Sequence, residues 1–321
     1  MEKIPMQRSC PKKFSARLFL LTILIFSSCQ TMKKSPTKSE EKIPSVPAQP
    51  VIIPVEPTVS PNQPAAPVPQ VVEPTVINPN SQSSTIRKNE KIALILSGGG
   101  AKVWGHVAVL KEFQKFKIPV VAVAGIEWGS VVGAVYAQNL SPNEVEWELA
   151  KFKDIDDWEK FLKAVFEKKS IADLKIPFVC PSVNMKKQNP YLLNRGLLEQ
   201  LLPFCLPSPG TVKPYSSSIA AMDHIPALVQ HLRATGATKV VLVNVLSQNN
   251  QNTYYKSLES IENQIWQLAS FSLKTAPVDE VINISFDNRK IDDFDDRREI
   301  LAQSTNLAYD QIKALAKKYG Y

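Results

Sequence analysis

The sequence predicts an α/β fold in which a largely parallel sheet carries helices on both faces. Apolar runs of strand length alternate with helical patterns, and glycine-rich turns separate them. Strands that alternate with helices are typical of parallel sheets, because the connecting helices cover both sides of the sheet. A chain of 321 residues with 44% apolar side chains can fill such a core.

The expected elements begin after residue 91. Apolar runs of the kind found in buried strands occur at 92–96, 120–124, 239–245 and 281–284. Helical patterns follow the first two runs and close the chain, at 107–113, 130–137 and about 297–318. Glycines lie between each of the first two strands and its helix, so two strand–turn–helix units come in succession.

The amino terminus has the pattern of an export signal. Five basic side chains precede the apolar run 18–26, and Ser27-Ser28-Cys29 follows it. The apolar run is about half of the ~20 residues that a membrane-spanning helix needs, so a cleaved signal at 1–28 is the stronger prediction. The segment from Phe26 to Cys29 resembles the lipobox of bacterial lipoproteins, which implies lipidation of Cys29. The alternative is an ordinary signal peptide with an incidental cysteine.

This resemblance also implies a location. Gln30 follows the cysteine, and the lack of Asp there implies sorting to the outer membrane of the bacterial envelope, with the protein anchored by lipid and facing the periplasm. Removal of residues 1–28 lowers the net charge from +8 to +4. The basic excess therefore belongs mostly to the signal, and no nucleic-acid partner is expected.

A proline-rich spacer is expected at 29–87, ahead of a folded domain at 88–321. Residues 33–84 hold twelve prolines and neither glycine nor aromatic residues. Proline fixes φ and removes a donor, so we expect a disordered, partly polyproline-II tether that reaches on the order of 100 Å at about 3.1 Å per residue. Such a tether would let the folded domain work away from the membrane that holds Cys29.

Two glycine turns carry the functional signal. The run Gly98-Gly99-Gly100 before a helix offers unblocked backbone N–H groups, which suit a phosphate or a developing oxyanion. It lacks the spacing of dinucleotide and P-loop motifs, and no cofactor is expected. The second turn has Gly125 and Gly129 around Glu127, between a buried strand and a helix of small residues. This is the frame of a nucleophile elbow, in which the central side chain is exposed above the sheet.

The two turns together resemble the patatin-like phospholipase family. The likeness rests on the order and spacing of 96–110 and 125–137, continues through the Asp223-His224-Ile225-Pro226 segment, and covers nearly all of 91–321. It implies a three-layer sandwich and an ancestral hydrolysis of acyl esters by a Ser–Asp dyad. The glycine run, with Lys102 in place of the usual Arg, would correspond to the oxyanion hole.

The resemblance also shows where this chain departs from the family. Glu127 stands at the position of the nucleophilic Ser, and Ser218 at that of the Asp. Val103 replaces a glycine, and Trp128 replaces a small residue beside the elbow. Attack by a carboxylate on an acyl carbonyl would give an anhydride, and no base then remains to activate water. We therefore expect a non-catalytic lipid-binding or scaffold protein, with a fatty-acyl ligand or an envelope protein as its partner.

Two other functions stay open. One is a lipid acyl hydrolase with an unconventional site, and the other is a purely structural tether whose pocket Trp128 fills. Ser130 and His106 are weaker candidates for nucleophile and base, since both lie on predicted helices. The four cysteines lack the spacing of a zinc or redox site, so no metal is expected. After export, Cys180 and Cys205 are compatible with a disulfide or with two free thiols.

Overall fold

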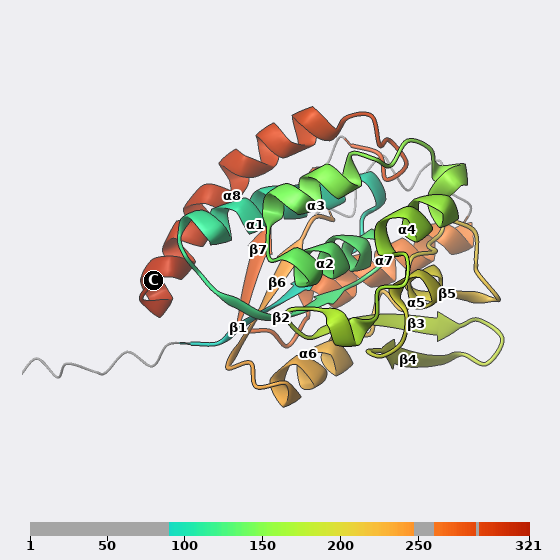
Figure 1. Ribbon diagram of the computed structural model, residues 1–321, viewed down its shortest axis with the longest axis horizontal. Helices are drawn as coiled ribbons and strands as arrows, with labels where there is room; N and C mark the ends of the chain where they lie inside the picture. Colours follow the sequence, from blue (N-terminus) through green and yellow to red (C-terminus); the bar gives the residue numbers. More distant parts are fainter. Residues whose placement is uncertain (1–89, 247–259, 287–288) are drawn as a thin grey trace, which may run out of the picture. The chain divides into compact units, whose positions relative to one another are not determined.

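Within residues 90–246, 260–286 and 289–321, which the computed structural model describes, seven strands form one sheet (Figure 1). The strands are β1 Ile92–Leu96, β2 Val120–Gly125, β3 Phe178–Asn184, β4 Asn189–Leu193, β5 Ser218–Ala220, β6 Lys239–Asn244 and β7 Glu280–Asn283. Their order is β4-β3-β2-β1-β6-β7, and β5 pairs with β3 outside this path. Neighbouring strands are parallel along the stretch β3-β2-β1-β6-β7 of this order. In contrast, β4 and β5 pair antiparallel with β3.

Helices cover both faces of the sheet. The described helices are α1 Trp104–Lys115, α2 Trp128–Asn139, α3 Pro142–Leu149, α4 Trp158–Phe166, α5 Leu198–Cys205, α6 Ile225–Ala234, α7 Ser260–Lys274 and α8 Arg297–Tyr319. Short 3-10 helices occur at η1 Gly100–Val103, η2 Ile155–Asp157 and η3 Ile171–Asp173. In Figure 1, α1, α3 and α8 lie above the sheet and α6 lies beneath it. The predicted α/β fold with a mostly parallel sheet is confirmed.

The central strand shows why the sequence gives this arrangement. All five residues of β1 are buried, since helices pack on both of its faces. Ile92, Leu94 and Leu96 point into the core under α1, α2 and α8, whereas Ala93 and Ile95 point into the core under α6 and α7. A strand that is buried on both sides must be apolar at every position, which is the pattern in the sequence.

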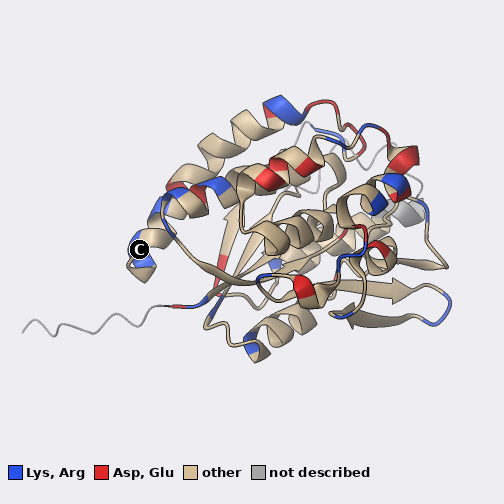
Figure 2. Ribbon diagram, in the orientation of Figure 1, with Lys and Arg blue, Asp and Glu red and all other residues tan. Residues whose placement is uncertain are grey.

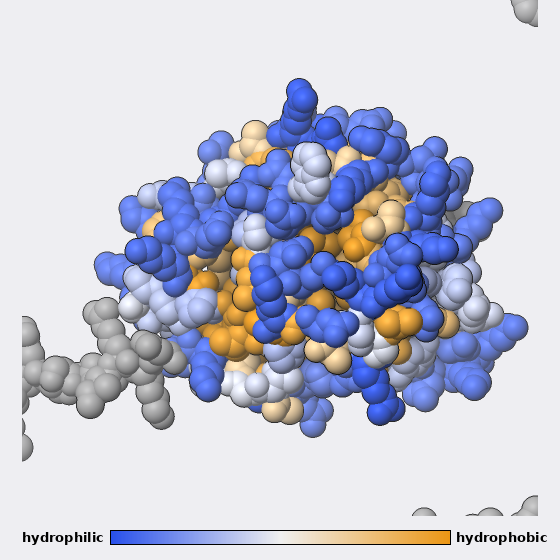
Figure 3. Space-filling view, in the orientation of Figure 1, coloured by the Kyte–Doolittle hydropathy of each residue, from blue (hydrophilic) through white to orange (hydrophobic). Residues whose placement is uncertain are grey.

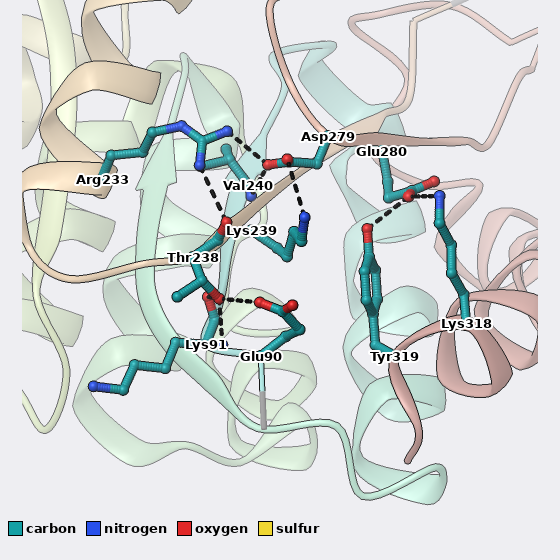
Figure 4. Close-up of polar contacts among 10 residues, drawn as sticks. All are labelled: Glu90, Lys91, Arg233, Thr238, Lys239, Val240, Asp279, Glu280, Lys318 and Tyr319. Carbon is teal, nitrogen blue, oxygen red and sulfur yellow. Dashed lines mark hydrogen bonds and ion pairs between the residues drawn. The ribbon is translucent and has the colours of Figure 1, made fainter. Parts of the chain in front are cut away.

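Polar side chains link helices to the amino ends of the strands, away from the glycine turns (Figure 4). Arg233 of α6 donates to Asp279, which directly precedes β7, at 2.8 Å. Lys318 and Tyr319 of α8 both donate to Glu280. Because these groups are partly exposed, each ion pair adds little stability. Their effect is to align the carboxyl end of α8 with β7.

A disulfide joins Cys180 of β3 to Cys205 at the end of α5, with the two Cα atoms 6.1 Å apart. Both cysteines are fully buried. Of the two states that the sequence allowed, the structure has the disulfide. The bond fixes the start of the loop that runs from α5 to β5, and this loop reaches the site described below.

The face of the molecule that Figure 3 shows is mainly polar. Figure 2 shows that the charged residues lie mainly in helices and loops, while most of the sheet carries none. In Figure 3, hydrophilic residues cover most of the same face, and apolar residues are visible between them. Among the described residues, no helix combines the length and apolar character that crossing a membrane requires. The predicted signal peptide, Cys29 and proline-rich spacer lie outside the described residues.

Candidate functional site

Glu127 lies in the sharp turn between β2 and α2. Its backbone has φ 55° and ψ −131°, a combination that a residue with a side chain seldom adopts. The turn is tight because both flanking glycines touch backbone. A Cβ on Gly125 would lie 2.3 Å from the carbonyl oxygen of Gly129, and a Cβ on Gly129 would lie 2.5 Å from that of Leu96. The structure therefore has the elbow that the glycine spacing predicts.

The Glu127 carboxylate is fully buried and receives hydrogen bonds on both oxygens. Oε2 accepts from the backbone N–H groups of Gly99 and Gly100, each at 2.9 Å. Oε1 accepts from the hydroxyl of Ser208 at 2.9 Å and from that of Thr211 at 3.3 Å. The glycine run and the elbow thus meet, and the carboxylate itself fills the place between them.

Burial and hydrogen bonding act in opposite directions on this carboxyl group. Removal from water raises the pKa of Glu127, because the charged form loses its hydration. The N–H groups of Gly99, Gly100 and Trp128 and the Ser208 hydroxyl lower the pKa, since they stabilise the charged form. Burial is the largest effect, so the pKa of Glu127 lies above its ordinary value.

The glycine run approaches other backbone closely enough to require glycine. Gly100 has φ 53°, and a Cβ there would lie 1.9 Å from the carbonyl oxygen of Ile291. Ala101 donates its N–H to the same carbonyl at 2.7 Å. A Cβ on Gly98 would lie 2.9 Å from the Cβ of Glu127. The segment after β7 therefore covers the run on one side, and Glu127 covers it on the other.

Lys102 and Trp128 close the surroundings of the elbow. The Lys102 side chain is buried, and its Nζ donates to the carbonyl oxygen of Phe286 at 2.9 Å. Trp128 is buried against the rings of Phe152 and Phe294, at centroid distances of 4.6 and 5.0 Å. A large ring thus fills the space beside the elbow where the family resemblance implies a small residue.

The structure places Ser218 on β5, where its hydroxyl lies 3.4 Å from that of Tyr191. The side chains that hydrogen-bond to the Glu127 carboxylate are instead Ser208 and Thr211, from the loop before β5. Sequence reasoning missed these two residues. The signal for them is weak: two hydroxyl residues flank Pro209-Gly210, a dipeptide typical of a turn.

The weaker candidates have structural roles in this site. His106 is buried, and its Nε2 lies 2.8 Å from the carbonyl oxygen of Ser97. Burial lowers the pKa of His106 to about 4, so the ring is neutral at neutral pH. The Ser130 hydroxyl donates to the backbone carbonyl of Glu127 at 2.6 Å and thereby supports the turn. Within the described part of the chain, no cluster of three His, Cys, Asp or Glu residues has the geometry to hold a metal.

Comparison with known proteins agrees with this geometry. A sequence model of the family described as "Patatin-like phospholipase" matches residues 94–303. The chain belongs to the patatin-like phospholipase family. Its elbow after β2 and its glycine run after β1 therefore sit in the part of the chain that the family model covers. The family is one of lipid hydrolases, and the fold that this chain shares with it is the patatin-like fold.

Several curated patatin-like relatives match over part of their length. Patatin-like phospholipase domain-containing protein 6 of Homo sapiens is 26% identical over 212 residues, which cover 56% of this chain and 15% of that protein. A patatin-like phospholipase domain-containing protein of Caenorhabditis elegans is 28% identical over 206 residues, 54% of this chain and 15% of its own. Lysophospholipase NTE1 of Debaryomyces hansenii is 23% identical over 193 residues, which cover 52% of this chain and 12% of that protein. The chain thus spans less than a sixth of each of these relatives.

Similar chains also occur among solved structures. VipD from Legionella pneumophila superposes with a TM-score of 0.41 and 10% sequence identity, over 72% of this chain and 67% of VipD.

Proposed function

We propose that this chain is a non-catalytic member of the patatin-like family. The observation that carries the proposal is the position of Glu127, whose Oε2 accepts hydrogen bonds from the N–H groups of both Gly99 and Gly100. Hydrolysis of an ester by this fold would need such donors for the negative oxygen of the tetrahedral intermediate. A carboxylate that is already bound to them competes with that oxygen, so the site inhibits itself.

Among the described residues, the side chains that hydrogen-bond to Glu127 also supply no base. The carboxylate contacts the hydroxyls of Ser208 and Thr211, and neither hydroxyl accepts a proton at neutral pH. Ser218, at the position implied for the catalytic Asp, is likewise a hydroxyl residue. Water therefore has no activating partner among the side chains that hold the carboxylate.

The setting of this function is the bacterial envelope. We infer that Cys29 is lipidated and that residues 29–87 tether the domain to the outer membrane on its periplasmic side. The disulfide between Cys180 and Cys205 supports this, because such bonds persist in oxidising compartments outside the cytoplasm. Incorporation of labelled palmitate into the unaltered chain, and its loss in Cys29→Ser, would support the anchor. Equal labelling of both chains would contradict it.

Hydrolysis assays test the absence of catalysis. The purified full chain is compared with Glu127→Ala, Glu127→Ser/Ser218→Asp and Glu127→Ser/Ser208→Asp on short and long acyl esters. We expect the unaltered chain and Glu127→Ala to match buffer alone. If the unaltered chain turns over ester and Glu127→Ala does not, the chain is a lipid acyl hydrolase with a carboxylate in its site, and the proposal is wrong. Each double variant adds a nucleophilic serine at 127 and an aspartate as base at 218 or 208. A comparison of their activities shows which of these two positions lets the aspartate act as the base.

A further inference from the structure

The loop at residues 207–214 forms one wall of a cavity whose lining does not include Glu127. The cavity has a volume of about 450 Å³, within the range of small-molecule sites. Its apolar lining comes from the loop, from the tip of the β3–β4 hairpin, from β5 and from α7: Met185, Pro209, Val212, Pro214, Ile219 and Ile265. We propose that this cavity binds the aliphatic chain of a single-chain amphiphile with an anionic head group.

The apolar lining of the cavity favours the aliphatic tail of the ligand. Of the residues that line the cavity, Val212 and Ile219 are almost fully buried, and Ile265 is half-buried on α7. Met185 is 49% exposed, which is unusual for a large apolar side chain and leaves an adaptable thioether in the wall. An aliphatic chain in this space would remove apolar surface from water, at a gain of about 25 cal/mol per Å².

The basic side chains at and near the cavity favour an anionic head group. Lys213 is exposed, and within 90–246, 260–286 and 289–321 it is the one charged side chain that lines the cavity. Among the described residues it takes part in no ion pair. Lys186 and Lys187 follow Met185 at the exposed tip of the hairpin, where Figure 2 shows basic colour. A carboxylate or phosphate head would therefore meet positive charge, whereas a cationic head would be repelled.

The loop is held in place from both sides. Trp266 of α7 is buried and donates its indole N–H to the carbonyl oxygen of Pro209 at 2.8 Å. On the opposite side, Ser208 and Thr211 bind Glu127. The cavity wall is thus preformed, which limits the ordering cost of binding. The proposal goes beyond the proposed function, which assigns no ligand, and takes the class of ligand from the lining and the charge of the cavity.

Quenching of tryptophan fluorescence tests the proposal on the full chain. The bromine atoms of dibrominated stearate quench indole emission at short range, and the buried Trp266 lies behind the cavity wall, hydrogen-bonded to Pro209. We expect saturable quenching that Trp266→Phe largely removes. Unlabelled stearate and a lysophospholipid with a phosphate head then compete with the probe separately, which distinguishes a free fatty acid from a lipid headgroup as the source of the anion. A cationic amphiphile with the same tail should compete at least tenfold less well.

Matched variants locate the site. Lys213→Glu should weaken binding roughly tenfold and reverse the preference toward the cationic amphiphile, whereas Lys313→Glu, on the exposed face of α8, should not. Ile265→Glu should weaken binding by at least tenfold, whereas Leu268→Glu should not, since Leu268 is 51% exposed on the same helix and does not line the cavity. Equal affinities in all four variants, or no saturable quenching, would overturn the proposal. Ester hydrolysis plays no part in this readout, so its result and that of the hydrolysis assay are independent.

Discussion

Replacement of Glu127 by alanine should destabilise the chain strongly, even though it removes a buried carboxylate. The alanine variant leaves the N–H groups of Gly99 and Gly100 without their acceptor. A buried donor without a partner costs about 1–3 kcal/mol, so the two amides together cost about 2–6 kcal/mol. Relief of the carboxylate's desolvation offsets part of this. We expect the free energy of unfolding to fall by about 2–4 kcal/mol, which urea denaturation followed by circular dichroism can measure.

Glu127→Gln is the matched control. The glutamine keeps an oxygen for the two N–H groups of the glycine run, and its amide can donate to the Ser208 hydroxyl. At acid pH the carboxyl group is neutral in both the folded and unfolded chains, so the variant should then lie within about 1 kcal/mol of the unaltered protein. The alanine and glutamine variants therefore separate the loss of the acceptor from the loss of the charge.

The same pair of chains gives a pH test with a definite sign. In the unfolded chain Glu127 has its ordinary pKa of 4.5, and burial raises the pKa in the folded chain. Between these two values the folded state binds more protons than the unfolded state, so stability falls as pH rises. The glutamine variant does not titrate there and shares all other groups. Its stability relative to the unaltered chain should thus increase from about pH 4.5 upward. The reasoning is refuted if that difference is independent of pH, or if Glu127→Ala is as stable as the unaltered chain.

Three further changes test the supports of the site. Reduction of the Cys180–Cys205 disulfide, which closes a segment with a sequence separation of 25, should cost about 3 kcal/mol; a melting temperature indifferent to reductant would contradict this. Gly100→Ala should lower the free energy of unfolding by on the order of 2–4 kcal/mol, because its Cβ would clash with the Ile291 carbonyl. A small change in the urea midpoint would contradict this and would mean that the segment around Ile291 moves away. Trp128→Ala should cost about 3–5 kcal/mol as a core cavity, and a loss under 1 kcal/mol would show that the ring packs loosely.

Most of the parallel part of the sheet was predictable because strands buried on both faces are apolar at nearly every position. This holds for β1, β2 and β6, whereas β7 has only Val281 and Ile282 as apolar residues; the sequence predicts each of the four within a few residues of its observed bounds. β3 to β5 escaped prediction for physical reasons. Pro181 interrupts β3, β4 is only half-buried, and β5 has three residues. Their pairing depends on contacts across the fold, which no local pattern records.

The candidate site, like the sheet, could be predicted only in part from the sequence. Glu127 could be placed on the elbow because the spacing of Gly125 and Gly129 is local and geometric. Ser208 and Thr211 lie more than eighty residues further along the chain, so nothing local connects them to the carboxylate. Cys205 is anchored to β3 by the disulfide, and the carbonyl of Pro207 accepts from the N–H of Ala220 on β5. These tertiary constraints bring the two hydroxyls to the elbow.

The carboxylate at the elbow therefore links stability to the proposed loss of catalysis. A serine at this position would leave the N–H groups of Gly99 and Gly100 open to a substrate oxygen and would leave Ser208 without its acceptor. Glu127 instead satisfies all of these donors within the folded chain. Any variant that regains hydrolysis here must give up those hydrogen bonds, so gained activity and lowered stability should appear together. An active variant with undiminished stability would mean that the glycine run binds the oxyanion by some other geometry.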